Sequence, residues 1–252
     1  EKFSLNGLIT SGFECYQGKR PSMEDTHVVI DYLSEHAVYE SAFGKEKKKK
    51  KTRRKDRICV YGVFDGHGGK EAAILVDHWL VKDILVKAKT PKQLRALLES
   101  GKIEKKSKEK KSSEAASSSN ATIIDQPVDE SFGGLLFSAY QNVDDRMKAF
   151  MSLYNTTSGS TCVLVFIYRH HLWISNAGDS EACLCYFRNS SAKAMLAHAL
   201  TKVHQPNDKK ETERIYRASG HVTSGRVGGS LAVTRSFGDF DLKAPQCGLQ
   251  DW

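Results

Sequence analysis

Apolar positions recur with two different periods along the chain, and the change of period marks the expected elements. Short apolar runs at 27–31 and 58–64 predict β-strands. Both alternating faces of 58–64 are apolar or small, which predicts a strand buried on both sides. Residues 70–88 carry apolar side chains every three or four positions, as a helix with one buried face does.

A short helix predicted over 91–99 opens with Pro91 in its first turn. The second half of the chain carries the same two kinds of pattern, and a long helix is predicted over 130–153. Arg169 and His170 separate two strands by a tight hairpin connection. The predicted strands of this half are three apolar runs: 160–168, 171–176 and 181–187.

A last helix is predicted over 208–219. Asp208 and Glu211 have the spacing of a capping box, and Gly220 is the expected C-terminal stop. Strands, helices, strands and a helix then follow one another in separate groups. Such segregation indicates an α+β fold rather than alternating βαβ units.

The net charge of +8 lies in one segment. Residues 45–57 hold ten Lys/Arg and two acidic residues, so the remainder of the 252-residue chain is close to neutral. Contact with nucleic acid or another polyanion through 45–57 is one interpretation, and a solvated surface loop is the other. Neither makes polyanion binding the main role. We expect two surface inserts, the basic 45–56 and the low-complexity 102–122, because neither can bury much apolar surface.

The composition narrows the class of protein. No apolar run approaches the about 20 residues that span a bilayer, so no membrane association is expected. None of the six cysteines forms a CxxC pair, and most lie among aliphatic residues. This usage is typical of a reducing compartment, so the expected location is the cytoplasm, the nucleus or both.

Two polar segments carry the candidate chemistry. Asp65-Gly66-His67-Gly68-Gly69 follows an apolar strand directly, which holds a carboxylate rigidly beside a backbone that can turn sharply. A carboxylate with an exposed carbonyl suits Mg²⁺ or Mn²⁺, although a tight turn with a surface histidine has the same pattern. Residues 18–25 place Arg20 shortly before Glu24 and Asp25, which suits phosphate and hydrated cations, or a simple surface ion pair.

Five segments in this order resemble the protein phosphatase 2C family, the metal-dependent serine/threonine phosphatases. They are RPSMEDTH, VYGVFDGHGG, SGSTCVLVFI, ISNAGDSEACL and GRVGGSLAVTRSFGDFD. The resemblance implies one catalytic domain over 1–252, built as an αββα sandwich of two antiparallel sheets flanked by helices. It also implies a hydrolase of phosphoserine and phosphothreonine proteins in signalling, acting as a monomer.

The resemblance implies a centre of two Mn²⁺ or Mg²⁺ ions. Carried over by position, Asp65 bridges both metals and Gly66 ligates one through its carbonyl oxygen. Glu24 and Asp25 act mostly through metal-bound waters. A water activated by the metals attacks phosphorus in line.

The same resemblance implies that Arg20, His67 and Asp25 are the catalytic residues. Arg20 binds the substrate phosphate, and His67 is the general acid that protonates the leaving serine or threonine oxygen. Asp179, Asp239 and Asp241 match segments that shape the sheet and the flap, so they are expected to be structural.

The chain departs from the family pattern in several places. Val203, before His204, replaces the family's usual Asp, and Thr156 stands where a third metal takes an Asp. The family completes its metal site with later Asp-Gly and Asp-Asn motifs, which do not occur before Trp252, so we expect a domain truncated at its C-terminus. The expected consequence is weak metal binding by these residues alone. Three explanations stay open: a fragment of an active enzyme, a pseudophosphatase that serves as a binding scaffold, or completion by a second polypeptide.

Overall fold

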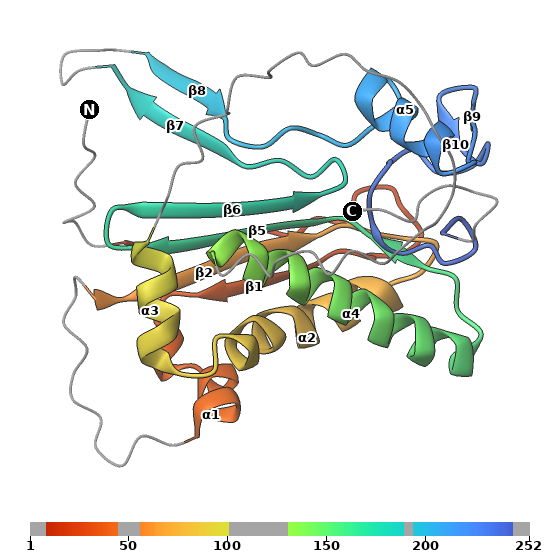
Figure 1. Cartoon of the computed structure of the whole chain (residues 1–252). Helices are drawn as coiled ribbons and strands as arrows, with labels where there is room; N and C mark the ends of the chain where they lie inside the picture. Colours follow the sequence, from red (N-terminus) through yellow and green to blue (C-terminus); the bar gives the residue numbers. More distant parts are fainter. Residues whose placement is uncertain (1–8, 45–55, 101–130, 189–193, 244–252) are drawn as a thin grey trace, which may run out of the picture.

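The computed structural model describes residues 9–44, 56–100, 131–188 and 194–243. It confirms the α+β class, with antiparallel sheets and helices grouped along the chain (Figure 1). The predictions for the two inserts lie outside the described residues, except at Asp56. Among the described helices, none combines the length and the apolarity that crossing a bilayer needs.

The largest sheet has four antiparallel strands in the order β1-β2-β5-β6. The strands at 58–64 and 171–176 were predicted within a residue of their bounds, and the hairpin at Arg169 and His170 is present, with Arg169 in the left-handed region (φ 55°). The strand bounds are β1 Thr26–Ile30, β2 Ile58–Phe64, β5 Cys162–Tyr168 and β6 His171–Ala177.

Helices cover one face of this sheet, and Figure 1 shows them as a layer below it. The two long helices pack side by side, as predicted for 70–88 and 130–153, and share one apolar core with β2 and β5. Phe132 is fully buried in this core, edge-on to both Phe166 and Trp173. The helix bounds are η1 Leu33–Glu35, α1 Ala37–Phe43, α2 Glu71–Lys87, α3 Pro91–Glu99 and α4 Phe132–Tyr154.

The other face of the sheet is only partly covered by the described residues. The prediction that β2 is buried on both sides holds only in part. Val60 and Phe64 face the helices and are fully buried, whereas on the other face Cys59 is buried but Val63 is 46% exposed. A two-stranded ribbon, β7 Cys183–Phe187 with β8 Met195–Ala199, lies on this side in Figure 1. It represents the second sheet of the expected sandwich, and β8 had not been predicted.

Short elements complete the described fold. The helix predicted over 208–219 is α5 Lys209–Arg217, and Asp208 caps it by accepting from the Lys210 amide. Glu211 was predicted to complete a capping box, but it turns inward to arginines instead. The left-handed residue after α5 is Ser219 (φ 63°), not Gly220. The remaining strands are β3 Gly66–His67, β4 Gly159–Ser160, β9 Val222–Thr223, β10 Arg226–Val227 and β11 Phe237–Gly238.

Candidate functional site

Asp65 lies between β2 and β3, and residues distant in the sequence hold its backbone by hydrogen bonds. Its amide donates to Thr161 Oγ1 at 3.2 Å, and the Thr161 amide donates to the Asp65 carbonyl at 2.9 Å. The Thr161 hydroxyl also lies 2.6 Å from the Ser180 hydroxyl. The segments around Thr161 and Ser180 therefore fix the direction in which the Asp65 carboxylate leaves the sheet.

The acidic pair Glu24-Asp25 reaches the same place because it immediately precedes β1. Thr26 pairs with Phe64, so the residues before Thr26 lie beside the residues after Phe64. The contact is close: a Cβ on Gly66 would lie 2.3 Å from the Glu24 carbonyl oxygen. Gly66 is thus required by the backbone of Glu24, which explains why a glycine follows Asp65.

The side chains around Asp65 carry an excess of negative charge. Burial raises the pKa of Asp65, and the carboxylates of Asp25 and Asp179 raise it further, while His67 opposes them. Asp25 is also within hydrogen-bonding reach of Asp65. Repulsion of this kind is relieved when a cation binds between the carboxylates.

These oxygen donors fit one side of a divalent-cation site. Carboxylate and carbonyl oxygens are the ligands that Mg²⁺ and Mn²⁺ prefer, and Asp65, Asp25 and the Gly66 carbonyl supply them. In the described ranges, however, no group of three or more His, Cys, Asp or Glu side chains is arranged to hold a metal ion. The donor set is that of part of a site.

His67 lies at the same end of the sheet and contacts a carboxylate far along the chain. Its Nε2 lies 3.0 Å and 2.9 Å from the two carboxylate oxygens of Asp239. Burial alone would lower the pKa of His67, but Asp239, with smaller contributions from Asp65 and Asp179, raises it above the usual value. The ring is therefore biased toward its charged, proton-donating form.

Arg20 is the predicted residue that the structure does not bring to this group. It lies in an exposed turn, where the Gln17 side chain donates to the Arg20 carbonyl at 2.7 Å. Across the parts of the chain that are described, no contact joins the Arg20 side chain to Asp65, Asp25 or His67. Its role in phosphate binding stays a prediction.

Two residues that the sequence suggested were structural lie in the site. Asp179 adds to the negative charge at Asp65 and accepts from Gln205 Nε2 at 3.0 Å, and Asp239 holds His67. The sequence feature that could have identified Asp179 and Asp239 is their position in polar motifs at the ends of secondary-structure elements. By contrast, His204 is structural: its Nδ1 accepts from the Gly178 amide at 3.2 Å, and burial lowers its pKa.

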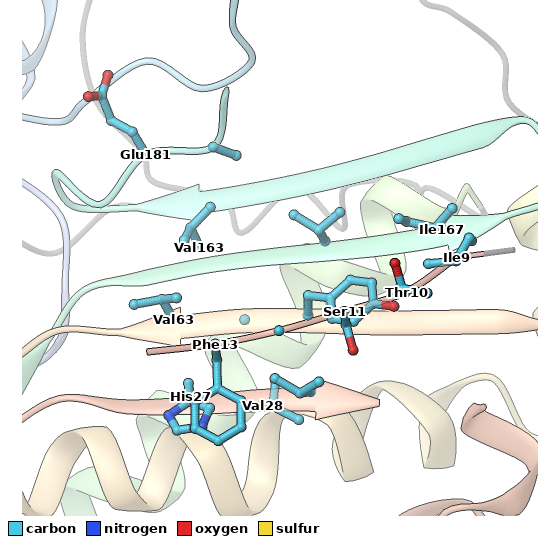
Figure 2. Close-up of a pocket in the computed structure, with 16 residues that line it drawn as sticks. Ile9, Thr10, Ser11, Phe13, His27, Val28, Val63, Val163, Ile167 and Glu181 are labelled. Atoms are coloured by element: carbon cyan, nitrogen blue, oxygen red, sulfur yellow. The ribbon is translucent and has the colours of Figure 1, made fainter. Parts of the chain in front are cut away.

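A cavity of about 480 Å³ lies elsewhere, on the sheet face away from α2 and α4. Figure 2 shows the segment from Ile9 to Phe13 crossing this face, with Phe13 beside His27 and with Val63 and Val163 above them in the view. Its lining is mostly apolar and contains none of the site carboxylates. The cavity is therefore separate from the candidate site.

The site and the fold together match one family. The sequence profile described as "Protein phosphatase 2C" matches residues 119–249, just over half of the chain. The chain belongs to the protein phosphatase 2C family.

Individual relatives extend the match over nearly the whole chain. A probable protein phosphatase 2C 27 of Arabidopsis thaliana is 30% identical over 98% of this chain and 50% of its own length. The mouse protein phosphatase 1B is 30% identical over 96% of this chain and 51% of its own length. The chain therefore spans about half the length of these curated relatives.

Solved structures show the same fold. A serine-threonine phosphatase 2C from Toxoplasma gondii matches with a TM-score of 0.55 at 18% identity, over 90% of this chain and 71% of that one. A C. elegans sex determining protein matches with a TM-score of 0.57 at 22% identity, over 90% of this chain and 43% of that one. Both confirm the architecture of α+β layers with antiparallel sheets.

Proposed function

We propose that this chain forms part of a metal-dependent protein serine/threonine phosphatase, whose substrates are phosphoserine and phosphothreonine proteins. The observation that supports this most is the meeting of Asp65, Asp25 and His67 at one end of the sheet, from two separate segments. Family membership supports the same conclusion. The five described cysteines are all free thiols. This supports the proposed location of the protein in the cytoplasm or the nucleus.

In this mechanism the residues divide the work between binding and proton transfer. Asp65 and the Gly66 carbonyl, with water held by Glu24 and Asp25, would hold Mn²⁺ or Mg²⁺, and two such ions make a complete site. Bound there, the cations supply positive charge for the phosphate oxygens and a nucleophilic water. Arg20 binds the phosphate, and His67 gives a proton to the leaving serine or threonine oxygen.

The function is tested by phosphate release from a phosphothreonine peptide. We expect hydrolysis by the protein that contains this chain in millimolar Mn²⁺ or Mg²⁺, and its loss in a chelator. Phosphate release that continues in the chelator would contradict a metal-dependent mechanism.

A binding scaffold without turnover is the second candidate. The departure from the family pattern at Thr156, where a third metal takes an Asp, supports it. It predicts that the phosphopeptide binds, with no phosphate released at any metal concentration. Calorimetry with the same peptide, run beside the hydrolysis assay, separates the two.

Replacing Arg20 with Ala is expected to raise KM for the phosphopeptide by about 10–100-fold, the cost of a lost charge-assisted hydrogen bond. The kcat should change little, because a clamp on the phosphate acts in the ground state as well. Lys19→Ala is the matched control, since Lys19 is a cation in the same exposed turn. Equal effects of the two substitutions, or a fall in kcat alone, would remove Arg20 from the substrate site.

A further inference from the structure

The contact between His67 and Asp239 depends on a small three-stranded sheet, in the order β3-β4-β11. His67 in β3 pairs with Gly159 in β4, and Gly159 pairs in turn with Gly238 in β11. Asp239 follows β11 directly. Two residues that are 172 positions apart therefore lie on opposite sides of one glycine.

Gly159 leaves room for this contact. A Cβ at Gly159 would lie 2.2 Å from Asp239 Oδ2 and 2.3 Å from His67 Nε2, both far inside van der Waals contact. Its φ is not in the left-handed region, so the backbone itself does not demand glycine there. The contact between His67 and Asp239 occupies the space that a side chain at position 159 would fill.

Asp239 is held in place without help from His67. Its carboxylate is 7% exposed and accepts a hydrogen bond from the Ser236 hydroxyl. Its backbone is left-handed (φ 50°), and its amide donates to the Ser158 carbonyl at 3.3 Å. The neighbouring Gly238 amide donates to Asp144 Oδ1 at 2.9 Å. The carboxylate is thus a fixed point against which the partly exposed His67 ring can be oriented.

We propose that Asp239 is a positioning residue for His67, which ties Nε2 of the ring and leaves Nδ1 as the nitrogen that serves the substrate. This inference rests on the proposed function. As the P–O bond to serine or threonine breaks, the Nδ1–H bond breaks and an O–H bond forms on the leaving oxygen. The ring is left neutral, with its remaining proton on Nε2 shared with Asp239. Water supplies the oxygen that phosphorus gains, its protons pass to the released phosphate and to solvent, and the ring regains its Nδ1 proton from solvent.

The contact itself is tested without catalysis, by NMR of residues 1–252 at one fixed pH. We expect nuclear Overhauser contacts between the ring protons of His67 and the α-protons of Gly159. They should persist in Asp239→Asn, whose amide oxygen still accepts from Nε2–H, and disappear in Asp239→Ala. Asp241→Ala is the matched control, because Asp241 is the next acidic residue and is exposed. Contacts that persist in Asp239→Ala would overturn the proposal.

A second variant disrupts the same contact through a third residue. Gly159→Ala alters neither partner, but its methyl group must separate them. We expect the same loss of ring contacts as in Asp239→Ala, so the test survives if one of the two variants does not fold. Unchanged ring contacts in a folded Gly159→Ala would also overturn the proposal.

The consequence for catalysis is tested by a double-mutant cycle in the protein that contains this chain. Asp239→Ala should lower kcat for a phosphopeptide by about 10–100-fold, as loss of a carboxylate that orients a functional histidine typically does, with KM unchanged. It should cost little with p-nitrophenyl phosphate, whose leaving group needs no acid. In a His67→Ala background, Asp239→Ala should cost nothing more, because the two act as a unit.

The outcomes separate the two proposals. A full additional loss in the His67→Ala background would mean that Asp239 acts through the structure and not through His67. No hydrolysis by the wild-type protein would overturn the proposed function, while the ring contacts would still decide whether Asp239 positions His67.

Discussion

If the proposed function holds, replacing Asp65 with Asn is expected to lower metal-dependent hydrolysis of a phosphothreonine peptide by at least about 10³-fold in the protein that contains this chain. The carboxylate stands at the point where β2 ends, and Asp25 and Asp179 concentrate further negative charge on it. Removing this charge takes away several kcal/mol of cation and transition-state stabilisation, and each 1.36 kcal/mol is about tenfold in rate. Phosphate release at saturating Mn²⁺ measures the effect.

The same substitution has an opposite effect on stability, which separates it from simple misfolding. The raised pKa of Asp65 means that its ionised form is disfavoured in the folded chain, so stability falls as pH rises through the range above the unfolded pKa of 3.8. Without metal, Asp65→Asn should therefore raise Tm at pH 7. Calorimetric titration should show weaker Mn²⁺ binding than in the wild type, whereas Asp241→Asn should change neither quantity. A lower Tm together with unchanged Mn²⁺ affinity would contradict the assignment.

Replacing Glu211 with Ala is expected to destabilise the fold by about 3–5 kcal/mol, the usual cost of leaving buried partners of a charge unpaired. Glu211 is 6% exposed and accepts from Arg235 Nε at 2.8 Å and Nη2 at 2.7 Å. Arg214 and the Thr234 hydroxyl each add a bond at 3.1 Å. Urea unfolding measures the loss.

Glu213 gives a matched control on the same helix. It is exposed, and among the described residues its ion pair is with exposed Arg217 at 3.4 Å, so Glu213→Ala should change the free energy of unfolding by less than about 1 kcal/mol. Equal effects of the two substitutions would show that the arginine pairing of Glu211 contributes little.

The stability from Glu211 has a defined pH range. Burial by itself would raise its pKa, but Arg235 and Arg214 lower it from 4.5 to about 2. The folded pKa is thus the lower one, so the contribution is complete above about 4.5 and is lost as pH falls toward 2. The difference between wild type and Glu211→Ala should shrink over that range.

Periodicity alone predicted most of the fold. The helices at 70–88 and 130–153 and the strands at 58–64 and 171–176 follow from local spacing, because each has one face against a shared core. β8 was missed since all its residues are exposed, which leaves no alternation to detect. The burial of β2 was overstated because apolar composition does not show what covers the second face.

The site was less predictable wherever it depends on partners distant in sequence. Asp65, Gly66 and His67 are contiguous, so one motif revealed them together. Asp239 depends on a register between strands that are far apart in the chain, which no local pattern contains. Glu211 was misread for the same reason: its spacing from Asp208 fits a cap, but Arg235 binds it more strongly.

The register across β3, β4 and β11 also sets the order in which the molecule is completed. Bringing ends together across 172 positions carries a loop-closure cost that local helices and hairpins do not. During synthesis, Asp65 and His67 emerge long before Asp239 exists to meet them. Until Asp239 has been synthesised, His67 therefore lacks the carboxylate that contacts its ring. The oriented histidine is a property of the assembled molecule and not of the motif that contains it.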